Sequence, residues 1–390
     1  MSNPRWAEAR IDLDAITGNV SALRGRTSAE LLAVVKADGY GHGLLPSARA
    51  AVAGGATWLG TALLAEALAL RASGIAEPRV LCWLSGPGES WGEAIEADVD
   101  VSANAPWAVE EIAAAARAVG GTARVHLKVD TGLSRGGAPA AAWEDLLDAA
   151  RKAEAEGTVR VVGVWSHLAY ADAPGHPTVL HQAEAFGEAV AAAERAGLQP
   201  EVRHLANSAA TLTAPDLHLD LVRPGIAVYG ISPVPDLGGP ADYGLRPAMT
   251  LTGRLTLVKR VPAGSGVSYG HEYVTDRETT VGLVPLGYAD GIPRHAGSTG
   301  PVLAAGRRRT VAGRVCMDQF VLDLGDDEAA AGDEVVLFGP GDDGEPTAQD
   351  WAEAAETIAY EIVTRIGPRV PRVHLGGAFG ATADLPKDRG

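Results

Sequence analysis

The sequence predicts an α/β fold, in which an N-terminal (β/α)8 barrel of the TIM type is followed by a mostly antiparallel β domain. Between residues 31 and about 230, short apolar or β-branched runs alternate with alanine-rich helical stretches. This alternation is typical of parallel strands with crossover helices. After about residue 235 the helical stretches disappear, and short Val- and Thr-rich runs separated by turns indicate an antiparallel β domain.

Eight runs support the barrel, and they cover residues 31–35, 57–61, 79–84, 99–103, 124–130, 161–167, 201–207 and 219–225. Eight such units over roughly 200 residues fit a barrel, which typically needs about 250. The alternative is an open doubly wound sheet, but no G-x-G-x-x-G follows an early strand. The segment 12–23 precedes the first run and is expected to be helical, with Asp14 as a candidate N-cap.

The Pro- and Gly-rich segment 231–244 is expected to link two domains, 1–235 and 236–390. The predicted strands of the second domain cover residues 254–261, 266–274, 279–287, 310–316, 319–324 and 333–339. A single helix is expected to begin near Asp350 and to end at Gly367.

Bulk composition argues against several kinds of partner and site. A formal net charge of −16 argues against nucleic-acid and acidic-membrane partners, because phosphate binding needs a basic surface. Two cysteines, Cys82 and Cys316, give neither a disulfide framework nor metal-ligand spacing, so no metal is expected. The first residues lack an apolar signal segment, and no run reaches 18 apolar residues. A soluble, cytoplasmic protein without a membrane partner is therefore expected.

Lys36 directly follows the first apolar run and precedes three closely spaced glycines, Gly39, Gly41 and Gly43. The active site of such a barrel lies at the C-terminal ends of its strands. A half-desolvated lysine there has a lowered pKa and can form a Schiff base, and the glycines let the backbone approach a ligand. Taken alone, Lys36 is better explained as a surface lysine after a strand, so the rest of the chain must decide.

Other strand ends also carry polar groups. Five of the eight ends offer ionisable or amide side chains or ligand-binding backbone groups, namely Lys36; Lys128, Asp130 and Arg135; Ser166 and His167; His204, Asn207 and Ser208; and Arg223, Gly225 and Ile226. Single polar residues at strand ends are often only caps. Their accumulation at five ends favours a binding site.

The ends of the last two predicted strands suggest a phosphate site. Barrel enzymes often bind phosphate there, and the Ser208 hydroxyl and the N–H groups of Gly225 and Ile226 are suitable donors. A phosphate at this place, a pyridine ring at Arg223 and an aldehyde on Lys36 would be one molecule, pyridoxal 5′-phosphate (PLP). Arginine keeps its proton, so it would leave the pyridine nitrogen unprotonated and weaken the electron sink. A weak sink suits racemisation better than transamination or elimination.

Nine motifs resemble, in order and from residue 33 to 373, those of the alanine racemases: AVVKADGYGHG, KVDTGLSRGG, WSHLAYAD, HLANSAA, VRPGIAVYG, VSYG, LGYADGIPR, GRVCMDQF and YEIVTRIGPRVPRV. The resemblance implies PLP-dependent interconversion of L- and D-alanine, which supplies D-alanine for peptidoglycan. It also implies that Lys36 holds PLP and is the base on one face of the substrate. Tyr269, in VSYG, resembles the base on the other face, which the second subunit of a homodimer with shared active sites supplies.

The resemblance assigns further roles. PLP is expected to be bound by Lys36, Tyr40, His167, Asn207, Ser208, Arg223, Gly225, Ile226 and Tyr360. Arg135 and Met317 resemble residues near the substrate carboxylate, and Tyr288 resembles a gatekeeper of the substrate entry. Lys128 matches a lysine that is carbamylated in many members, with an unmodified lysine in a salt bridge as the alternative. Supporting positions are His204, Arg294 and Asp318.

Three other functions are weighed against this one. A PLP-dependent barrel decarboxylase would carry a carboxylate where this chain has Arg223. A non-enzymatic PLP carrier would lack the second domain and Tyr269. A racemase of broader specificity, acting on serine for example, remains open, because discrimination between small side chains rests on only about 1–3 kcal/mol per methylene.

Overall fold

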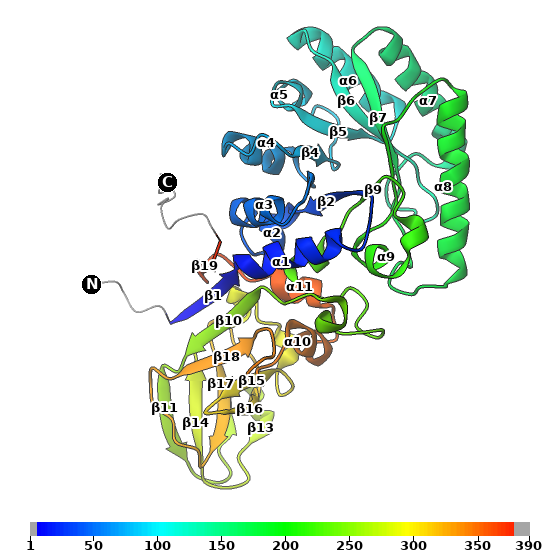
Figure 1. Cartoon of the computed structure of the whole chain (residues 1–390). Coiled ribbons are helices and arrows are strands. Elements are labelled where there is room, and N and C mark those ends of the chain that lie inside the picture. The colour runs from blue at the N-terminus through cyan, green and yellow to red at the C-terminus, as the bar shows by residue number, and fades with distance from the viewer. Residues whose placement is uncertain (1–5, 378–390) are drawn as a thin grey trace.

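The barrel of the computed structural model, which describes residues 6–377, lies at the top of Figure 1. Its strands are β2 (Glu30–Val34), β3 (Trp58–Thr61), β4 (Arg79–Cys82), β5 (Val99–Ala103), β6 (Ala123–Lys128), β7 (Val159–Trp165), β8 (Val202–His204) and β9 (Leu221–Val222). Its helices are α2 (Lys36–Tyr40), α3 (Leu44–Ala53), α4 (Leu64–Ala72), α5 (Trp91–Glu96), α6 (Pro106–Val119), α7 (Ala140–Ala155), α8 (Pro177–Arg195) and α9 (Ser208–Thr213). Each of the eight predicted runs overlaps one of these strands, so the barrel prediction is confirmed.

The eight strands form one parallel sheet in the order β8-β7-β6-β5-β4-β3-β2-β9. Hydrogen bonds between the last two strands complete the ring, because Asp220 N–H donates to Arg203 O at 3.2 Å and Arg223 N–H donates to Ala206 O at 2.9 Å. All C-terminal strand ends therefore face one mouth.

Burial explains why the apolar runs become barrel strands. Every residue of β3 and of β5 is buried, since barrel strands are covered by side chains inside and by helices outside. The helices are apolar on one face only. In α6 the buried residues are Ala108, Val109, Ile112, Ala113 and Ala116, which follow helical spacing.

A helix before the barrel, α1 (Leu13–Arg24), confirms the helical prediction but corrects its cap. The Asp12 carboxylate accepts a hydrogen bond from Ala15 N–H at 3.0 Å and is the N-cap, whereas Asp14 lies inside the first turn. The prediction of Asp14 was wrong because both aspartates precede the same apolar face, and only backbone geometry distinguishes them.

Replacing Asp12 with alanine is expected to lower the free energy of unfolding by about 1 kcal/mol, as for a lost N-cap. Chemical denaturation measures it. Asp14→Ala is the matched control, and a larger loss for this control than for Asp12→Ala would contradict the capping assignment.

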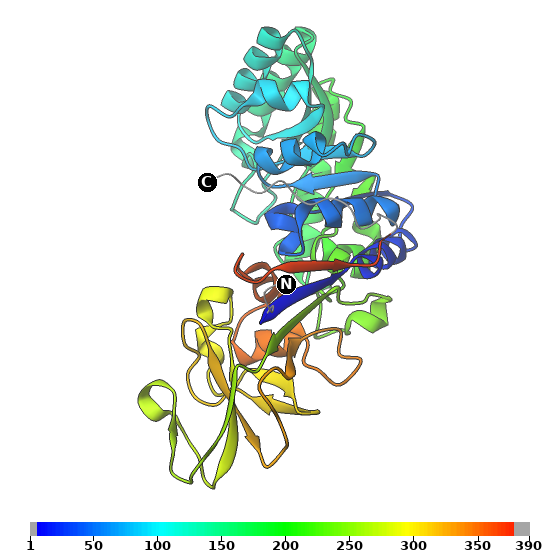
Figure 2. The same ribbon diagram turned by 90° about the vertical axis from the view of Figure 1, so that its left-hand side faces the viewer.

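The second domain lies below the barrel in Figures 1 and 2. Its strands are β10 (Met249–Arg254), β11 (Leu257–Val261), β12 (Gly266–Val267), β13 (Tyr273–Val274), β14 (Thr279–Val284), β15 (Pro301–Ala304), β16 (Arg307–Thr310), β17 (Phe320–Gly325) and β18 (Glu334–Phe338). Apart from one parallel pair, described next, the strand pairs of this domain are antiparallel, as predicted.

The first strand of the chain, β1 (Ala7–Asp12), pairs with the second domain and not with the barrel. It runs antiparallel to β10 and parallel to β19 (Arg372–Leu375), in a six-stranded sheet of order β16-β15-β18-β10-β1-β19. Figure 2 shows both strands between the two parts of the molecule. The sequence division at residue 235 stays a prediction, and the outermost residues of both predicted domains, 1–5 and 378–390, lie outside the described range.

The single helix predicted between Asp350 and Gly367 is wrong, because two short helices lie there. They are α10 (Ala348–Ala354) and α11 (Ala359–Thr364). Glu356, between them, adopts a left-handed φ of 52°, which ends a right-handed helix. The Thr347 side chain caps α10 by accepting from Asp350 N–H at 3.1 Å. Among the described helices, none combines the length and the apolar character that crossing a bilayer requires.

Candidate active site

Lys36 lies at the barrel mouth, two residues after the end of β2. The residues that follow it form a left-handed turn, in which Ala37, Asp38, Gly39 and Tyr40 all have φ between 53° and 61°. Left-handed backbone costs roughly 1–2 kcal/mol for each residue with a Cβ atom, so other contacts must hold it.

Two carboxylates provide those contacts. Glu66 Oε1 accepts from Ala37 N–H at 2.6 Å, and its other oxygen accepts from Ala62 and Leu63 N–H, both at 3.1 Å. Asp38 Oδ1 accepts from Leu44 N–H at 2.8 Å. The turn therefore fixes the direction in which the chain leaves Lys36.

Four cations gather at the mouth, and we call Lys36, Lys128, Arg135 and Arg223 the cationic cluster. Burial, and secondly the charge of Arg135, lowers the pKa of the Lys36 amine. Burial and then Arg223 and Arg135 lower the pKa of Lys128 to about 8. Burial and the same cations lower the pKa of His167 to about 3, so this imidazole is neutral at pH 7. The cluster suits an anionic ligand, and Lys36 is a more available nucleophile than an ordinary lysine.

The ring of Trp165 packs against two members of the cluster. The Lys128 ammonium lies 4.3 Å from its ring centroid, and the Arg223 guanidinium carbon lies 5.0 Å from it. Arg223 is 5% exposed and donates to the carbonyl oxygens of Ser166 at 2.8 Å and Leu205 at 3.2 Å. It is thus a rigidly held cation at the mouth, as its position after the eighth strand predicts.

Ser208, Gly225 and Tyr40 form a small polar cradle at the ends of β8 and β9. Ser208 Oγ accepts from Gly225 N–H at 2.7 Å, and Asn207 caps α9 through Ala210 N–H at 3.1 Å. A Cβ atom at Gly225 would lie 2.3 Å from the Tyr40 hydroxyl oxygen. Only glycine keeps this space open, so the cradle fits a group with several acceptor oxygens, such as a phosphate. Ile226 begins the short 3-10 helix that follows.

Tyr360 brings the C-terminal part of the chain to the same place. It lies on α11, which contacts α2, and its ring centroid is 6.4 Å from that of Tyr40. Burial raises the pKa of Tyr360 to about 12, so its hydroxyl remains a hydrogen-bond donor at neutral pH. The structure therefore brings the predicted barrel residues and Tyr360 together.

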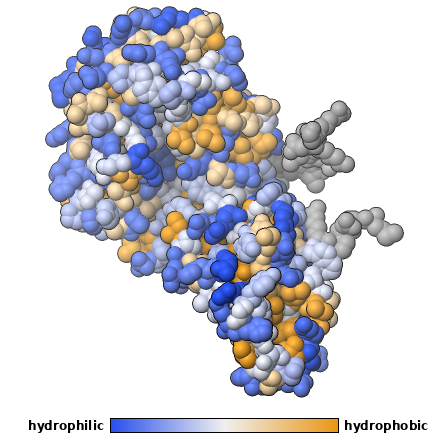
Figure 3. All heavy atoms as spheres, turned by 180° about the vertical axis from the view of Figure 1, so that it is seen from behind, coloured by the Kyte–Doolittle hydropathy of each residue, from blue (hydrophilic) through white to orange (hydrophobic). Residues whose placement is uncertain are grey.

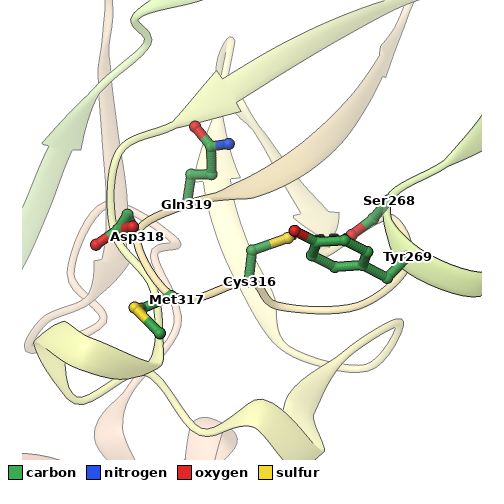
Figure 4. A pocket seen from close by; sticks show the side chains of 6 residues that line it. All are labelled: Ser268, Tyr269, Cys316, Met317, Asp318 and Gln319. Carbon is green, nitrogen blue, oxygen red and sulfur yellow. Dashed lines mark hydrogen bonds between the residues drawn. The ribbon is translucent and has the colours of Figure 1, made fainter.

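A second group of predicted residues lies apart, in a pocket of about 360 Å³ lined by Ser268, Tyr269, Cys316, Met317, Asp318 and Gln319. All its lining residues belong to the second domain. In Figure 4, Tyr269 gathers with Ser268 and Cys316 on one side, opposite Met317 and Asp318. Tyr269 is 71% exposed and Met317 53%.

Two further predicted residues, Tyr288 and Arg294, do not line this pocket, whereas Asp318 does. Tyr288 N–H donates to Cys316 O at 3.0 Å, which places the Tyr288 backbone beside a residue that lines the pocket. Asp318 accepts from Arg369 at 2.8 Å, and this arginine also pairs with Asp290 at 3.0 Å. Arg294 is exposed, and its charge helps to lower the pKa of Glu272. Within the single chain it therefore does not lie with His167 and Arg223.

Sequence reasoning missed three residues close to this site, two of them fully buried. Glu66 braces the turn after Lys36, and His126 and Asp100, both 0% exposed, lie inside the barrel below His204. A signal for the last two exists, since Asp100 and His126 each stand between two apolar residues of a predicted strand. For Glu66, on an ordinary helix start, no such signal exists.

A parallel barrel with a desolvated lysine and an anion cradle at its mouth, joined to a β domain, defines a two-domain barrel enzyme. Comparison with known families gives the same architecture. The family described as alanine racemase, N-terminal domain, matches residues 11–233, and the alanine racemase C-terminal domain matches residues 248–374.

Individual relatives of high sequence identity are also alanine racemases. The alanine racemase of Frankia casuarinae is 66% identical over 368 residues, covering 94% of this chain and 96% of the relative. That of Streptomyces coelicolor is 65% identical over 374 residues, covering 95% and 96%. A crystal structure of alanine racemase from D-cycloserine-producing Streptomyces lavendulae superposes with a TM-score of 0.95 at 61% identity, covering 96% of this chain and 98% of that one. The chain belongs to the alanine racemase family.

Proposed function

We propose that the protein interconverts L- and D-alanine with PLP as cofactor. The observation that carries this proposal is the arrangement at the barrel mouth, where a lysine of lowered pKa, a buried arginine and an anion cradle lie together. Family membership supports the choice of reaction. Peptidoglycan supply and a cytoplasmic location follow as family expectations.

The residues at the mouth fit PLP. Ser208, Gly225, Ile226, Tyr40 and Tyr360 would hold its phosphate through hydroxyl and backbone donors. Lys36 would hold its aldehyde carbon, and Arg223 would donate to its pyridine nitrogen, with His167 and Asn207 nearby. PLP so held withdraws electrons from the substrate α-carbon, which makes the α-proton removable.

Two proton-handling groups are needed, one on each face of the α-carbon. Lys36 holds or moves the α-proton on one face. Tyr269 of the partner subunit would do so on the other, with Arg135 and Met317 near the substrate carboxylate, Tyr288 at the entry, and Arg294 and Asp318 in support.

The distribution of residues supports a homodimer with shared sites. Tyr269 and Met317 are exposed in a pocket without barrel residues, and Val274, close to Tyr269 in the sequence, is 53% exposed. Figure 3 shows apolar surface gathered in patches on the second domain as well as on the barrel. Exposed apolar patches of this kind mark interaction surfaces.

Gly225→Ala is expected to weaken PLP affinity by about one to two orders of magnitude, since overpacking costs about 1–3 kcal/mol. The added Cβ atom would lie 2.3 Å from the Tyr40 hydroxyl oxygen. Fluorescence titration of apoprotein with PLP measures the effect. Gly187→Ala, where the added atom meets nothing within 4 Å, is the control. Unchanged affinity in Gly225→Ala would contradict the phosphate assignment.

Lys128 is proposed to be carbamylated, with the anion held by Arg135. Only the neutral amine reacts with CO₂, and the pKa of about 8 leaves a larger neutral fraction at pH 7 than an ordinary lysine has. A carbamate ¹³C NMR signal after incubation with ¹³C-bicarbonate is therefore expected, and it should decline as the pH falls below about 8. Lys128→Ala should abolish the signal and Lys152→Ala should retain it; a signal unaffected by Lys128→Ala would refute the assignment.

The function itself is tested by racemisation assays over a panel of L-amino acids, with and without added PLP. Alanine is expected to react fastest, and only with PLP bound. A higher kcat/KM for serine or a larger substrate would instead favour a racemase of broad specificity. Purified protein that stays colourless after incubation with PLP would refute the cofactor proposal.

A further inference from the structure

A chain of hydrogen bonds leads from Arg223 at the barrel mouth into the barrel interior. Arg223 Nη1 lies 3.1 Å from His204 Nδ1. His204 Nε2 lies 2.9 Å from His126 Nδ1, and His126 Nε2 lies 3.2 Å from Asp100 Oδ2. Arg223 is 5% exposed and the other three side chains are 0% exposed.

The two ends of this chain fix the position of every proton in it. A guanidinium can only donate, so Arg223 uses the lone pair of His204 Nδ1, and the His204 proton must be on Nε2. It donates to His126 Nδ1, which places the His126 proton on Nε2, directed at Asp100. An ionised carboxylate can only accept, so the donors and acceptors match at each step. Burial also lowers the pKa of both histidines, which keeps them neutral.

The surroundings hold both imidazole rings in place. Trp165 stacks on His204 with 5.6 Å between ring centroids and 3° between planes. Trp58 meets His126 edge-on at 5.6 Å. On β7, a Cβ atom at Gly163 would lie 2.1 Å from His126 Nδ1, so the ring occupies space that only glycine leaves free.

Asp100 supplies the negative charge at the inner end. Burial opposes its ionisation, but the hydrogen bond from His126 and the charges of Arg79 and Arg124 keep the pKa of Asp100 below its usual value. Arg223, by contrast, donates to neutral acceptors only in its other hydrogen bonds, the carbonyl oxygens of Ser166 and Leu205. We call this chain of hydrogen bonds the relay. Through it, the Asp100 carboxylate polarises the two imidazole rings and so acts on the buried Arg223 cation without contacting it.

We propose that His126 and Asp100 are positioning residues which, through His204, hold the Arg223 guanidinium in the orientation needed to face the pyridine nitrogen of the cofactor. This inference rests on the proposed PLP-dependent function. If the relay is broken, Arg223 is held less firmly, and the pyridine nitrogen can accept a proton from water.

A purely structural role is the competing explanation. Asp100 also binds Arg79 and, at 2.5 Å, Arg124, and contacts at the inner end of a barrel typically serve stability. Such a role predicts lower stability in every variant, but no fixed tautomers and no change in the protonation of the cofactor ring.

The first test uses protein without cofactor. Nitrogen-15 solid-state NMR of histidine-labelled protein reports which ring nitrogen carries the proton. Both His126 and His204 are expected to carry it on Nε2. A proton on Nδ1 of either residue in the wild-type protein overturns the proposal, whether or not any variant folds and whether or not PLP binds.

The second test uses protein loaded with PLP that carries ¹⁵N at the pyridine nitrogen. His126→Leu breaks the relay, whereas His126→Gln can still accept from His204 and donate to Asp100. Arg124→Gln removes an ion pair of Asp100 but leaves the relay, and it controls for lost stability. Gly163→Ala displaces the His126 ring from a different strand and serves if His126→Leu does not fold.

His126→Leu and Gly163→Ala are expected to raise the pH at which the ring nitrogen gains a proton, and to lower kcat by about 10- to 100-fold with a smaller change in KM. The His126→Gln and Arg124→Gln variants should stay close to the wild type. Equal behaviour of the Leu and Gln variants, or the same shift in Arg124→Gln, overturns the proposal. Failure of the wild-type protein to bind PLP, with the Nε2 tautomers present, would instead refute the proposed function.

Discussion

Tyr269→Phe is expected to abolish most α-proton exchange from one enantiomer of alanine while largely sparing the other. Removing the hydroxyl takes away the proposed proton-handling group on one face, and such groups contribute about 10²- to 10⁴-fold to rate. Lys36 would still exchange the proton on its own face. The measurement is the loss of the α-proton signal of L- and of D-alanine in D₂O, followed separately by NMR. The rate of overall racemisation should fall to that of the slower exchange, because racemisation needs both faces.

The control for this experiment is Tyr243→Phe, a tyrosine in the 3-10 helix Pro240–Tyr243 that lies outside both groups of site residues. It should exchange both enantiomers at the wild-type rate. Equal losses for L- and D-alanine in Tyr269→Phe would contradict the assignment of Tyr269 to a single face. Measuring the PLP content of each variant separates lost chemistry from lost cofactor.

The barrel could be predicted because its signal is local. The strands are short apolar runs such as 31–35, and most of them are followed by a helix whose apolar residues repeat with helical spacing. Once eight such units are counted, the topology of a parallel barrel brings all strand ends to one mouth. Lys36, Lys128, Ser208 and Arg223 could therefore be grouped without any knowledge of distances.

Features that depend on long-range pairing could not be predicted in this way. Strand β1 pairs with β10, more than 230 residues later, and nothing within Ala7–Asp12 specifies that partner. The break between α10 and α11 depends on the left-handed backbone at Glu356, a residue type that normally favours a right-handed helix.

The same limit applies within the site. The turn 37–40 places Ala37, Asp38 and Tyr40 in a conformation that residues with a Cβ atom avoid, and it persists because Glu66 and Asp38 bind its backbone. Sequence patterns predict low-energy local structure, so strained segments held by distant side chains escape them.

The separation of the two groups of site residues leads to the last prediction. The barrel mouth offers Lys36 but no second base on the opposite face is assigned there, and Tyr269 lies in a pocket made of second-domain residues alone. If each active site combines Lys36 of one subunit with Tyr269 of the other, two inactive variants can complement each other. A heterodimer of Lys36→Ala and Tyr269→Phe subunits would contain one site with both wild-type residues and one site with neither.

Random exchange of equal amounts makes half of the dimers mixed, with one functional site in each, so about a quarter of the wild-type activity is expected for a symmetric dimer. Activity is measured after refolding the variants together, with subunit exchange verified by two affinity tags. Mixing Lys36→Ala with the Lys36→Ala/Tyr269→Phe double variant is the control and should restore nothing, because no site then contains Lys36. If exchange is verified and the first mixture is also inactive, each active site is built within one subunit, and Tyr269 must reach the barrel mouth of its own chain.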